Sequence, residues 1–475
     1  MIKTKLVATV GPACDHDATL GEMIDAGVNV LRLNFSHGTL ETHAASVARI
    51  RRVASEREAI VAVMGDLCGP KIRLGPIAGG RCELAVGQRV AFRRGTFDGT
   101  PERLSSSYPA LVDDVEVGQR VLIDDGNVRL RVTERRPDEL ACVCEVGGAI
   151  SDRKGINLPD SHVSSPALTD KDRSDLEWAI RNDLDLIALS FVRKPEDLSE
   201  LRRILVAHGS RMRVVSKIEK PEAVAELNAI VAESDVVLVA RGDLGVEMDV
   251  SRVPLIQKEI ALLCWRTGKP VIVATQMLQS MVDSPVPTRA EVSDVANAIL
   301  DRADAVMLSA ETSVGKYPLE AVRMIRRIAE HTESFGACYA DELGANQATT
   351  VPVATAVVRG ANSIARELGV RLVAVWTETG ETPRLLSKHR LGQPIVALAA
   401  DERVCRQMAL LYGVVPIAAA QSREMRENLA YLDKLLLDRH LANANDRVVV
   451  AADTRPDLPG ETDALFIHVV GTAGR

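Results

Sequence analysis

The chain has 475 residues, of which 46% are hydrophobic and 26% are charged, and its net charge is −7 at pH 7. This length predicts roughly two to four domains, while the acidic balance and an aromatic content of only 3% argue against nucleic acid as a partner. No apolar run approaches a signal segment or a membrane span, and the eight cysteines include no Cys-x-x-Cys pair. We therefore expect a cytoplasmic protein with reduced thiols and no membrane partner.

Short apolar runs recur along the first two-thirds of the chain, and most are followed by an amphipathic helical pattern. The runs cover residues 6–10, 28–33, 60–64, 186–189, 213–215, 236–239, 270–273 and 305–308. Residues 318–333 show the helical side, with Leu319, Val322, Ile325 and Ile328 forming one stripe. Apolar strands that alternate with such helices predict a parallel sheet covered by helices. Eight such units predict a (β/α)8 TIM barrel, assigned to residues 1–70 and 167–343.

The pattern changes to period two between the third and fourth runs. Residues 128–132 alternate in this way just after the turn signal Asp125-Gly126. We expect residues 71–166 to form an inserted β-barrel lid domain, because loops at the mouth of such a barrel carry active sites. A rigid decoration is the alternative interpretation.

A second α/β region is expected from residue 344 to residue 475. Its strand candidates are residues 371–376, 395–398, 414–418, 447–450 and 464–469, with helical stretches between them. This arrangement predicts a separate C-terminal open-sheet domain.

Charged and hydroxyl side chains follow most of the predicted barrel strands, where active sites of this fold gather. Lys217 and Glu219 lie two residues apart on one strand and therefore project to the same side. Asp243 follows the next strand and can join Glu219 in holding Mg²⁺, which usually takes one or two protein carboxylates. Lys217 then faces a transferring phosphoryl group, and the backbone around Gly242 can bind a carboxylate. Taken alone, the Lys-x-Glu motif fits a structural ion pair better, and the Gly-Asp-x-Gly motif fits a turn better.

The sequence resembles pyruvate kinases in several segments that follow the family's order over nearly the whole chain. The matching segments are residues 34–38, 66 with 69–73, 154–159, 216–219, 240–245, 274–277, 287–291 and 294–298. The resemblance implies a glycolytic phosphotransferase that moves the phosphoryl group of phosphoenolpyruvate to ADP, giving pyruvate and ATP. It also implies a homotetramer.

The resemblance implies a role for each matching side chain. Lys217 steadies the phosphoryl group in transfer, Arg32 and Arg73 bind it, and Thr275 lies where the enolate is protonated. Glu219 and Asp243 hold Mg²⁺, with Mn²⁺ as an alternative metal. The substrate contacts are assigned to Arg32, Lys217, Gly242, Asp243 and Thr275, and the nucleotide contacts to Asn34, His37, Arg73 and Lys154. Arg289, Asp294 and Asn297 are interpreted as structural or interfacial.

Many pyruvate kinases need K⁺ at a position matching Asn34, Ser36, Asp66 and Leu67. In those members the position of Lys71 is Glu, whereas this chain resembles the subgroup with Lys and no K⁺ requirement. An ammonium supplies the same charge, and a second cation would meet a repulsion of ~4 kcal/mol at ~4 Å for an effective dielectric of about 20. We therefore expect K⁺ not to be required.

A hydroxyl-rich turn precedes a predicted helix that begins near Pro383. Its residues Thr377, Thr379, Gly380 and Thr382 match the family's loop for the phosphate of an effector, here a sugar phosphate or AMP. A plain helix cap is the alternative.

Three departures from the family pattern, at Thr42, Cys68 and Ala310, leave the nucleotide preference open. Two other functions remain as alternatives. One is an aldolase or lyase barrel that acts on pyruvate through Mg²⁺. Such an enzyme would need fewer cationic side chains than the three present here, Arg32, Arg73 and Lys154. The other is a non-catalytic metabolite sensor, and the argument against it is that four residues are intact: Lys217, Glu219, Asp243 and Thr275.

Overall fold

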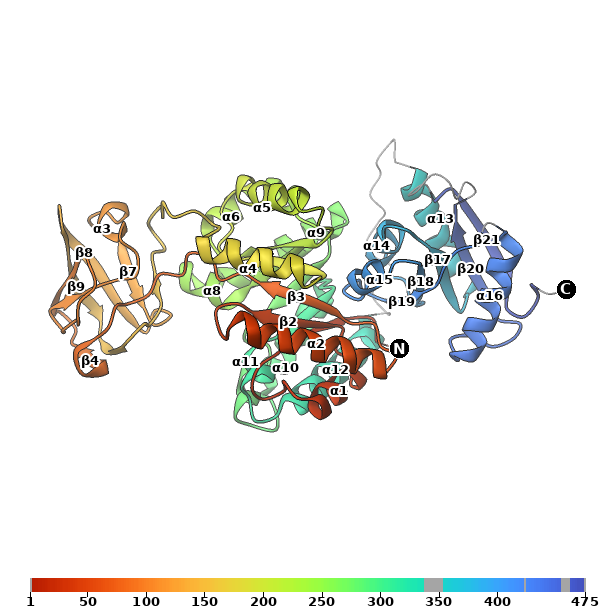
Figure 1. Cartoon of the computed structure of the whole chain (residues 1–475), viewed down its shortest axis with the longest axis horizontal. Coiled ribbons are helices and arrows are strands. Elements are labelled where there is room, and N and C mark those ends of the chain that lie inside the picture. Colours follow the sequence, from red (N-terminus) through yellow and green to blue (C-terminus); the bar gives the residue numbers. More distant parts are fainter. Residues whose placement is uncertain (1, 337–352, 423, 454–461, 474–475) are drawn as a thin grey trace.

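The computed structural model describes residues 2–336, 353–422, 424–453 and 462–473. Figure 1 shows a helix-clad barrel in the middle, a β-rich insert on one side and an α/β domain on the other. The expected boundary at residues 343–344 lies outside the described residues.

Eight parallel strands close the barrel, in the order β1-β2-β3-β12-β13-β14-β15-β16. They are β1 (Lys5–Thr9), β2 (Val30–Asn34), β3 (Ala62–Asp66), β12 (Leu186–Leu189), β13 (Arg213–Ile218), β14 (Val236–Ala240), β15 (Val271–Ala274) and β16 (Ala305–Leu308). The helices of this part are α1 (Asp17–Asp25), α2 (Leu40–Glu56), α4 (Asp170–Arg181), α5 (Pro195–Ala207), α6 (Pro221–Ala225), α7 (Leu227–Glu233), α8 (Arg241–Glu247), α9 (Val253–Thr267), α10 (Arg289–Leu300), α11 (Ala310–Ser313) and α12 (Pro318–Gly336), with 3-10 turns at Val250–Arg252 and Gln279–Val282. The predicted TIM barrel is confirmed.

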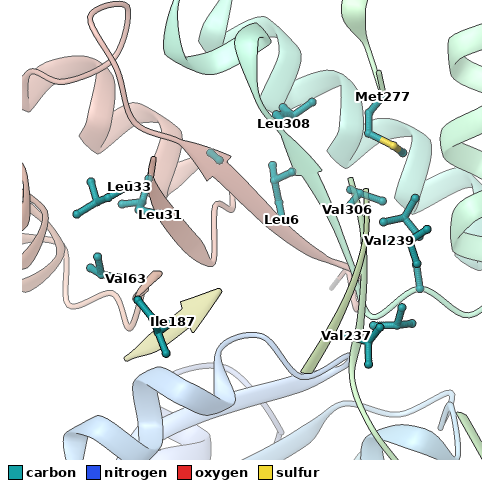
Figure 2. Close-up of a cluster of buried hydrophobic side chains, with 14 of the residues drawn as sticks. Leu6, Leu31, Leu33, Val63, Ile187, Val237, Val239, Met277, Val306 and Leu308 are labelled. Atoms are coloured by element: carbon teal, nitrogen blue, oxygen red, sulfur yellow. The ribbon is translucent and has the colours of Figure 1, made fainter. Parts of the chain in front are cut away.

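The strands of the barrel are buried on both faces, which explains their uninterrupted apolar runs. Alternate residues enter two different clusters: Leu6 and Ala8 pack against the helices, and Val7 between them fills the barrel interior. Figure 2 shows part of the outer cluster, in which side chains from several strands meet.

The insert between β3 and α4 is β-rich, as the sequence predicts. Its strands pair as a six-stranded sheet β11-β7-β8-β9-β5-β6 and a two-stranded sheet β10-β4. They are β4 (Arg81–Leu84), β5 (Arg89–Arg93), β6 (Arg103–Leu104), β7 (Arg120–Ile123), β8 (Val128–Arg136), β9 (Glu139–Val146), β10 (Gly148–Ser151) and β11 (Ile156–Asn157), with α3 (Leu111–Asp114) and a 3-10 turn (Ala78–Gly80) between them. Asp124, Asp125 and Gly126 turn β7 into β8 with positive φ angles. The buried Cys142 and Cys144 share the inner face of β9.

The C-terminal domain is an open sheet in the order β19-β18-β17-β20-β21, with the last strand antiparallel. Its elements are α13 (Val353–Leu368), β17 (Leu372–Trp376), α14 (Glu381–Lys388), β18 (Ile395–Ala399), α15 (Glu402–Met408), β19 (Val414–Ala418), α16 (Met425–Asp438), β20 (Arg447–Ala452) and β21 (Ala464–Val469). The expected strands are confirmed. Helix α14 begins at Glu381, two residues before the expected Pro383, so the proline lies inside the first turn.

The insert and the C-terminal domain adjoin opposite ends of the barrel (Figure 1). The insert follows the C-terminal end of β3, at the mouth where polar residues were expected. The C-terminal domain contacts the other end, where Lys5 of β1 donates a hydrogen bond from Nζ to the carbonyl of Val414, 2.7 Å away. Leu410 packs into the interior barrel cluster from that side. Among the described helices, none is long and apolar enough to cross a membrane.

Candidate active site

Register places the polar ends of neighbouring strands side by side. Asn34 at the end of β2 lies opposite Asp66 at the end of β3, and Lys217 of β13 lies opposite Leu238 of β14. Because parallel strands end at the same edge, the side chains that follow them share the barrel mouth.

A buried cluster of charges occupies this mouth. Asp66 accepts a bond from Arg32 Nε at 2.7 Å and lies 3.3 Å from Lys217 Nζ, while Glu219 Oε1 lies 2.8 Å from the same Nζ. The side chains of Asp66 and Glu219 are each 2% exposed. The structure therefore brings four of the residues expected in the site into one connected network.

Electrostatics favour the charged forms of Lys217 and Asp66 in this network. Burial alone would lower the pKa of Lys217, but the carboxylates of Asp66 and Glu219 more than offset it and the pKa is raised. Burial alone would raise the pKa of Asp66, but Lys217 and Arg32 hold it below its usual range. Burial and the nearby Asp243 raise the pKa of Glu219, against the opposing pull of Lys217. A second cation beside Glu219 and Asp243 would relieve their repulsion.

Ser190 and Thr9 belong to the network and were missed from the sequence. Ser190 Oγ accepts from Lys217 Nζ at 2.7 Å and donates to the carbonyl of Leu67. Thr9 Oγ1 accepts from Arg32 at 3.0 Å. Ser190 directly follows β12, and Thr9 is the last residue of β1. The expectation that site residues lie at the ends of apolar strands therefore applies to both.

A second group of contacts joins the ends of β14 and β15. The backbone N–H of Gly242 donates to Thr275 Oγ1 at 2.7 Å, and that hydroxyl donates to the carbonyl of Ala274. Thr275 has a φ of 69°, which is unusual for a β-branched residue and typical of functional sites. Arg241 spans from the Thr275 carbonyl to Asp294 of α10.

The carboxylates of Glu219 and Asp243 fit a magnesium site. Within the described ranges no group of three or more His, Cys, Asp or Glu side chains gathers as a metal site. Mg²⁺ suits such a sparse set, because it keeps water and substrate oxygens in its remaining positions. Burial and the charge of Asp243 both raise the pKa of Glu219, and a cation beside the two carboxylates would offset both effects.

Some expected nucleotide-binding residues lie outside the central network. Lys154 pairs with Asp124 at 2.7 Å, and Arg73 donates to the carbonyl of Arg153, so both are held within the insert. The carbonyl of His37 accepts from His43. Asn34 Oδ1 accepts the N–H of Ser36, beside Asp66.

Lys71 lies at the base of the insert. It is exposed and lines a pocket between insert and barrel together with Phe191, Lys220 and Asp243. Leu67 is buried, and its carbonyl accepts from Ser190.

The expected effector loop lies at the opposite end of the barrel, next to the start of β13. Thr377 Oγ1 accepts from the N–H of Gly380, and Thr379 Oγ1 accepts from the N–H of Glu381 at 3.4 Å. Thr382 is buried and shares a hydrogen bond with Thr462. The carbonyl of Thr379 accepts from Arg213 of β13.

Comparison with known proteins matches both main parts of the chain. A family model described as the barrel domain of pyruvate kinase matches residues 1–322, and one described as its alpha/beta domain matches residues 355–468. A pyruvate kinase of Mycobacterium tuberculosis is 40% identical, with 98% of each chain covered. One of Geobacillus stearothermophilus is also 40% identical, over 98% of this chain and 80% of its own. A crystal structure of a pyruvate kinase from Cryptosporidium parvum superposes with a TM-score of 0.92 at 34% identity, covering 99% of this chain and 96% of that chain.

Proposed function

Because the chain belongs to the pyruvate kinase family, we propose that the buried charge cluster at the barrel mouth is its catalytic centre. The chain is a phosphotransferase that moves the phosphoryl group of phosphoenolpyruvate to ADP and gives pyruvate and ATP in glycolysis. The proposal rests on one observation: the buried ammonium of Lys217 lies between the carboxylates of Asp66 and Glu219.

Phosphoryl transfer depends mainly on positioning and charge stabilisation. Lys217 and Arg32 supply the fixed positive charges, and Asp66 holds both in place. Gly242 and Thr275 bind the carboxylate of phosphoenolpyruvate. The Thr275 hydroxyl lies where the enolate receives its proton, and its contact with the Gly242 N–H fixes its direction.

Glu219 and Asp243 would hold Mg²⁺, the metal that pyruvate kinases generally use, with Mn²⁺ as an alternative. When bound, this ion supplies positive charge to the phosphoryl oxygens. Asn34, His37, Arg73 and Lys154 bind the nucleotide phosphates.

No K⁺ is needed in this proposal, because Lys71 supplies the monovalent charge beside Asn34, Ser36, Asp66 and Leu67. The exposed ammonium of Lys71 lines the pocket that also contains Asp243, which supports a role near the phosphates. It also stands where the insert joins the barrel.

The wider assignments rest on the family. The catalytic barrel covers residues 1–70 and 167–343. The insert of residues 71–166 acts as a lid, and residues 344–475 form the regulatory domain. Thr377, Thr379, Gly380 and Thr382 receive the phosphate of a sugar phosphate or AMP, although the buried bond of Thr382 to Thr462 leaves mainly the first three for a ligand. The enzyme is a cytoplasmic homotetramer.

One assay separates the proposal from its alternatives. Pyruvate release from phosphoenolpyruvate is measured with Mg²⁺, with and without ADP. We expect release that depends on ADP, with ATP formed in equal amount. Release without ADP would identify a lyase, and no turnover would identify a sensor.

A further inference from the structure

We infer that Glu247 is a positioning residue that ties the insert to the two carboxylates of the metal site. This inference rests on the proposed roles of Glu219 and Asp243. Glu247 ends α8, the helix that begins at the barrel mouth with Arg241 and carries Asp243.

Glu247 is the point at which the insert and the barrel share one carboxylate. Its Oε1 accepts from Asn157 Nδ2 of β11 at 2.7 Å and from Lys220 Nζ at 2.7 Å. Asn157 belongs to the insert, whereas Lys220 lies two residues beyond the end of the barrel strand β13. The side chain of Glu247 is only 1% exposed, so this is a buried charge that needs its partners.

The second carboxylate oxygen of Glu247 is an unused hydrogen-bond acceptor. Oε2 is buried and has no hydrogen-bond partner among the described residues. Glu247 lines the pocket between insert and barrel, and so do Asn157, Lys220 and Asp243. A buried carboxylate with one unused oxygen beside a pocket can exchange partners as the insert moves, without leaving its place on α8.

Both metal carboxylates are adjacent to this contact. Asp243 and Glu247 are four residues apart on α8 and therefore lie on the same helical face. Lys220 is the neighbour of Glu219 in the chain and lies 5.9 Å from the centre of the Phe191 ring, and the Phe191 N–H donates to Glu219 Oε2. A shift at Asn157 thus reaches Asp243 through α8 and Glu219 through Lys220 and Phe191.

Glu247 also controls the charge next to the metal site. Lys220 is largely buried and paired with it. Without the Glu247 carboxylate, the Lys220 ammonium would turn to the nearest carboxylates and compete with the divalent ion for them.

The decisive experiment measures Mn²⁺ binding to the whole enzyme without substrates, by electron paramagnetic resonance. Asn157→Ala breaks the tie to the insert but leaves the Glu247–Lys220 pair, and Gln88→Ala is its matched control. The side chain of Gln88 bonds within the insert, to the carbonyl of Pro101 and the N–H of Ala85. We expect Asn157→Ala to weaken Mn²⁺ binding several-fold, in line with the loss of outer-shell contacts that orient metal ligands. Gln88→Ala should leave it unchanged.

Removing the charge of Glu247 should have a larger effect. Glu247→Gln should weaken Mn²⁺ binding by about 10-fold, and Lys220→Met combined with Glu247→Gln should recover most of the loss. Because both variants perturb the same carboxylate, combining Asn157→Ala with Glu247→Gln should weaken Mn²⁺ binding by less than the product of their separate fold-changes. In turnover assays the Mg²⁺ concentration for half activity should rise while kcat at saturating Mg²⁺ stays within about twofold.

Two results would overturn the inference: Mn²⁺ affinity unchanged in Asn157→Ala and Glu247→Gln, or a lower thermal midpoint as their sole effect. Asp243→Asn separates this failure from a failure of the proposed function. If Asp243→Asn leaves Mn²⁺ binding intact, the metal site itself is wrongly assigned; if it abolishes binding, the other variants test Glu247 alone.

Discussion

The ammonium of Lys217 has three N–H groups and three protein acceptors, on Asp66, Glu219 and Ser190. A phosphoryl oxygen can gain a bond from this ammonium only by taking the place of one of them. The strength of that new bond depends on charge that develops during transfer, so Lys217 is better suited to the transition state than to the bound substrate.

Lys217→Met should therefore lower turnover by orders of magnitude and barely change the Michaelis constants. Steady-state kinetics with phosphoenolpyruvate and with ADP measure both. Lys258→Met is the control, since Lys258 is an exposed lysine paired with Asp301, and it should behave as the unchanged enzyme. Turnover close to native in Lys217→Met would remove Lys217 from the catalytic role.

The proposed independence from K⁺ centres on Lys71, which stands where K⁺-dependent members have Glu. Activity in buffer free of K⁺ and Na⁺, with a large organic cation setting the ionic strength, should respond little to added K⁺. Lys71→Glu should acquire a K⁺ requirement, because it removes the ammonium and adds a negative charge. Lys258→Glu changes an exposed lysine of α9 that pairs with Asp301, and it should acquire no K⁺ requirement. Strong stimulation of the unchanged enzyme by K⁺ contradicts the idea.

At this scale the sequence predicts residue types better than it predicts conformations. Lys217, Glu219 and Asp66 were found because they follow apolar runs, and Ser190 was missed although it follows one as well. The positive φ angles of Thr275 and Phe191 had no signal, since a β-branched or aromatic residue disfavours that region. Such strain is imposed by the surrounding barrel and cannot be inferred from the residue itself.

Among the elements, α10 depends on an unusual cap. Glu291 accepts the N–H and hydroxyl of Thr288, in a capping box, and also the N–H and hydroxyl of Ser280. The carboxylate thereby fixes the loop after β15 to the helix that bears Asp294, the partner of Arg241.

Glu291→Gln should lower the free energy of unfolding at pH 7 by about 1–2 kcal/mol. Burial alone would raise the pKa of Glu291, but the bonds from Ser280 and Thr288 outweigh it and lower the pKa. A lowered folded pKa contributes stability above the unfolded pKa that is lost as the pH falls through the folded one. The difference in the free energy of unfolding between wild type and variant, measured with urea, should thus become smaller at acid pH. Exposed Glu177→Gln should show no difference at either pH, and a constant deficit for Glu291→Gln would argue against the charged cap.

Strand positions followed from the sequence more closely than strand ends. The run at residues 186–189 coincides with β12, whereas the apolar run at residues 213–215 covers only the first half of β13, which ends at Ile218. Ser216 and Lys217 interrupt the apolar run, but the backbone ladder to β14 continues through both. Hydrogen bonding between strands does not depend on side-chain polarity, so a strand can extend beyond its apolar run.

For the whole molecule, buried lysines join the barrel to the C-terminal domain. Lys5 donates to the Val414 carbonyl, and Lys388 of α14 pairs with Asp304 at the start of β16. Burial, only partly offset by Glu333, lowers the pKa of Lys5 to about 8. This interface therefore contains a charge that is costly to bury at neutral pH.

The stability contributed by Lys5 should rise with pH. Between about pH 8 and 10.5 the unfolded chain keeps the proton that the folded chain has lost, so unfolding becomes less favourable as the pH increases. Relative to Lys5→Met, the wild type should gain up to ~3 kcal/mol across this window. Paired thermal or urea unfolding of the two proteins near pH 7 and near pH 10 measures the gain. Exposed Lys434→Met should give a difference independent of pH, and the same result for Lys5→Met would contradict the prediction.

The strand β13 begins at Arg213, which holds the carbonyl of Thr379, and it carries Lys217 roughly 13 Å further along. The strand thus contacts the C-terminal domain at its first residue and carries the proposed catalytic lysine near its last. The two ends can therefore evolve separately. Substitutions around Thr379 change what the start of β13 contacts and leave the reacting atoms unchanged. A lineage can thus change the proposed effector loop at Thr379 while it inherits the reaction unchanged.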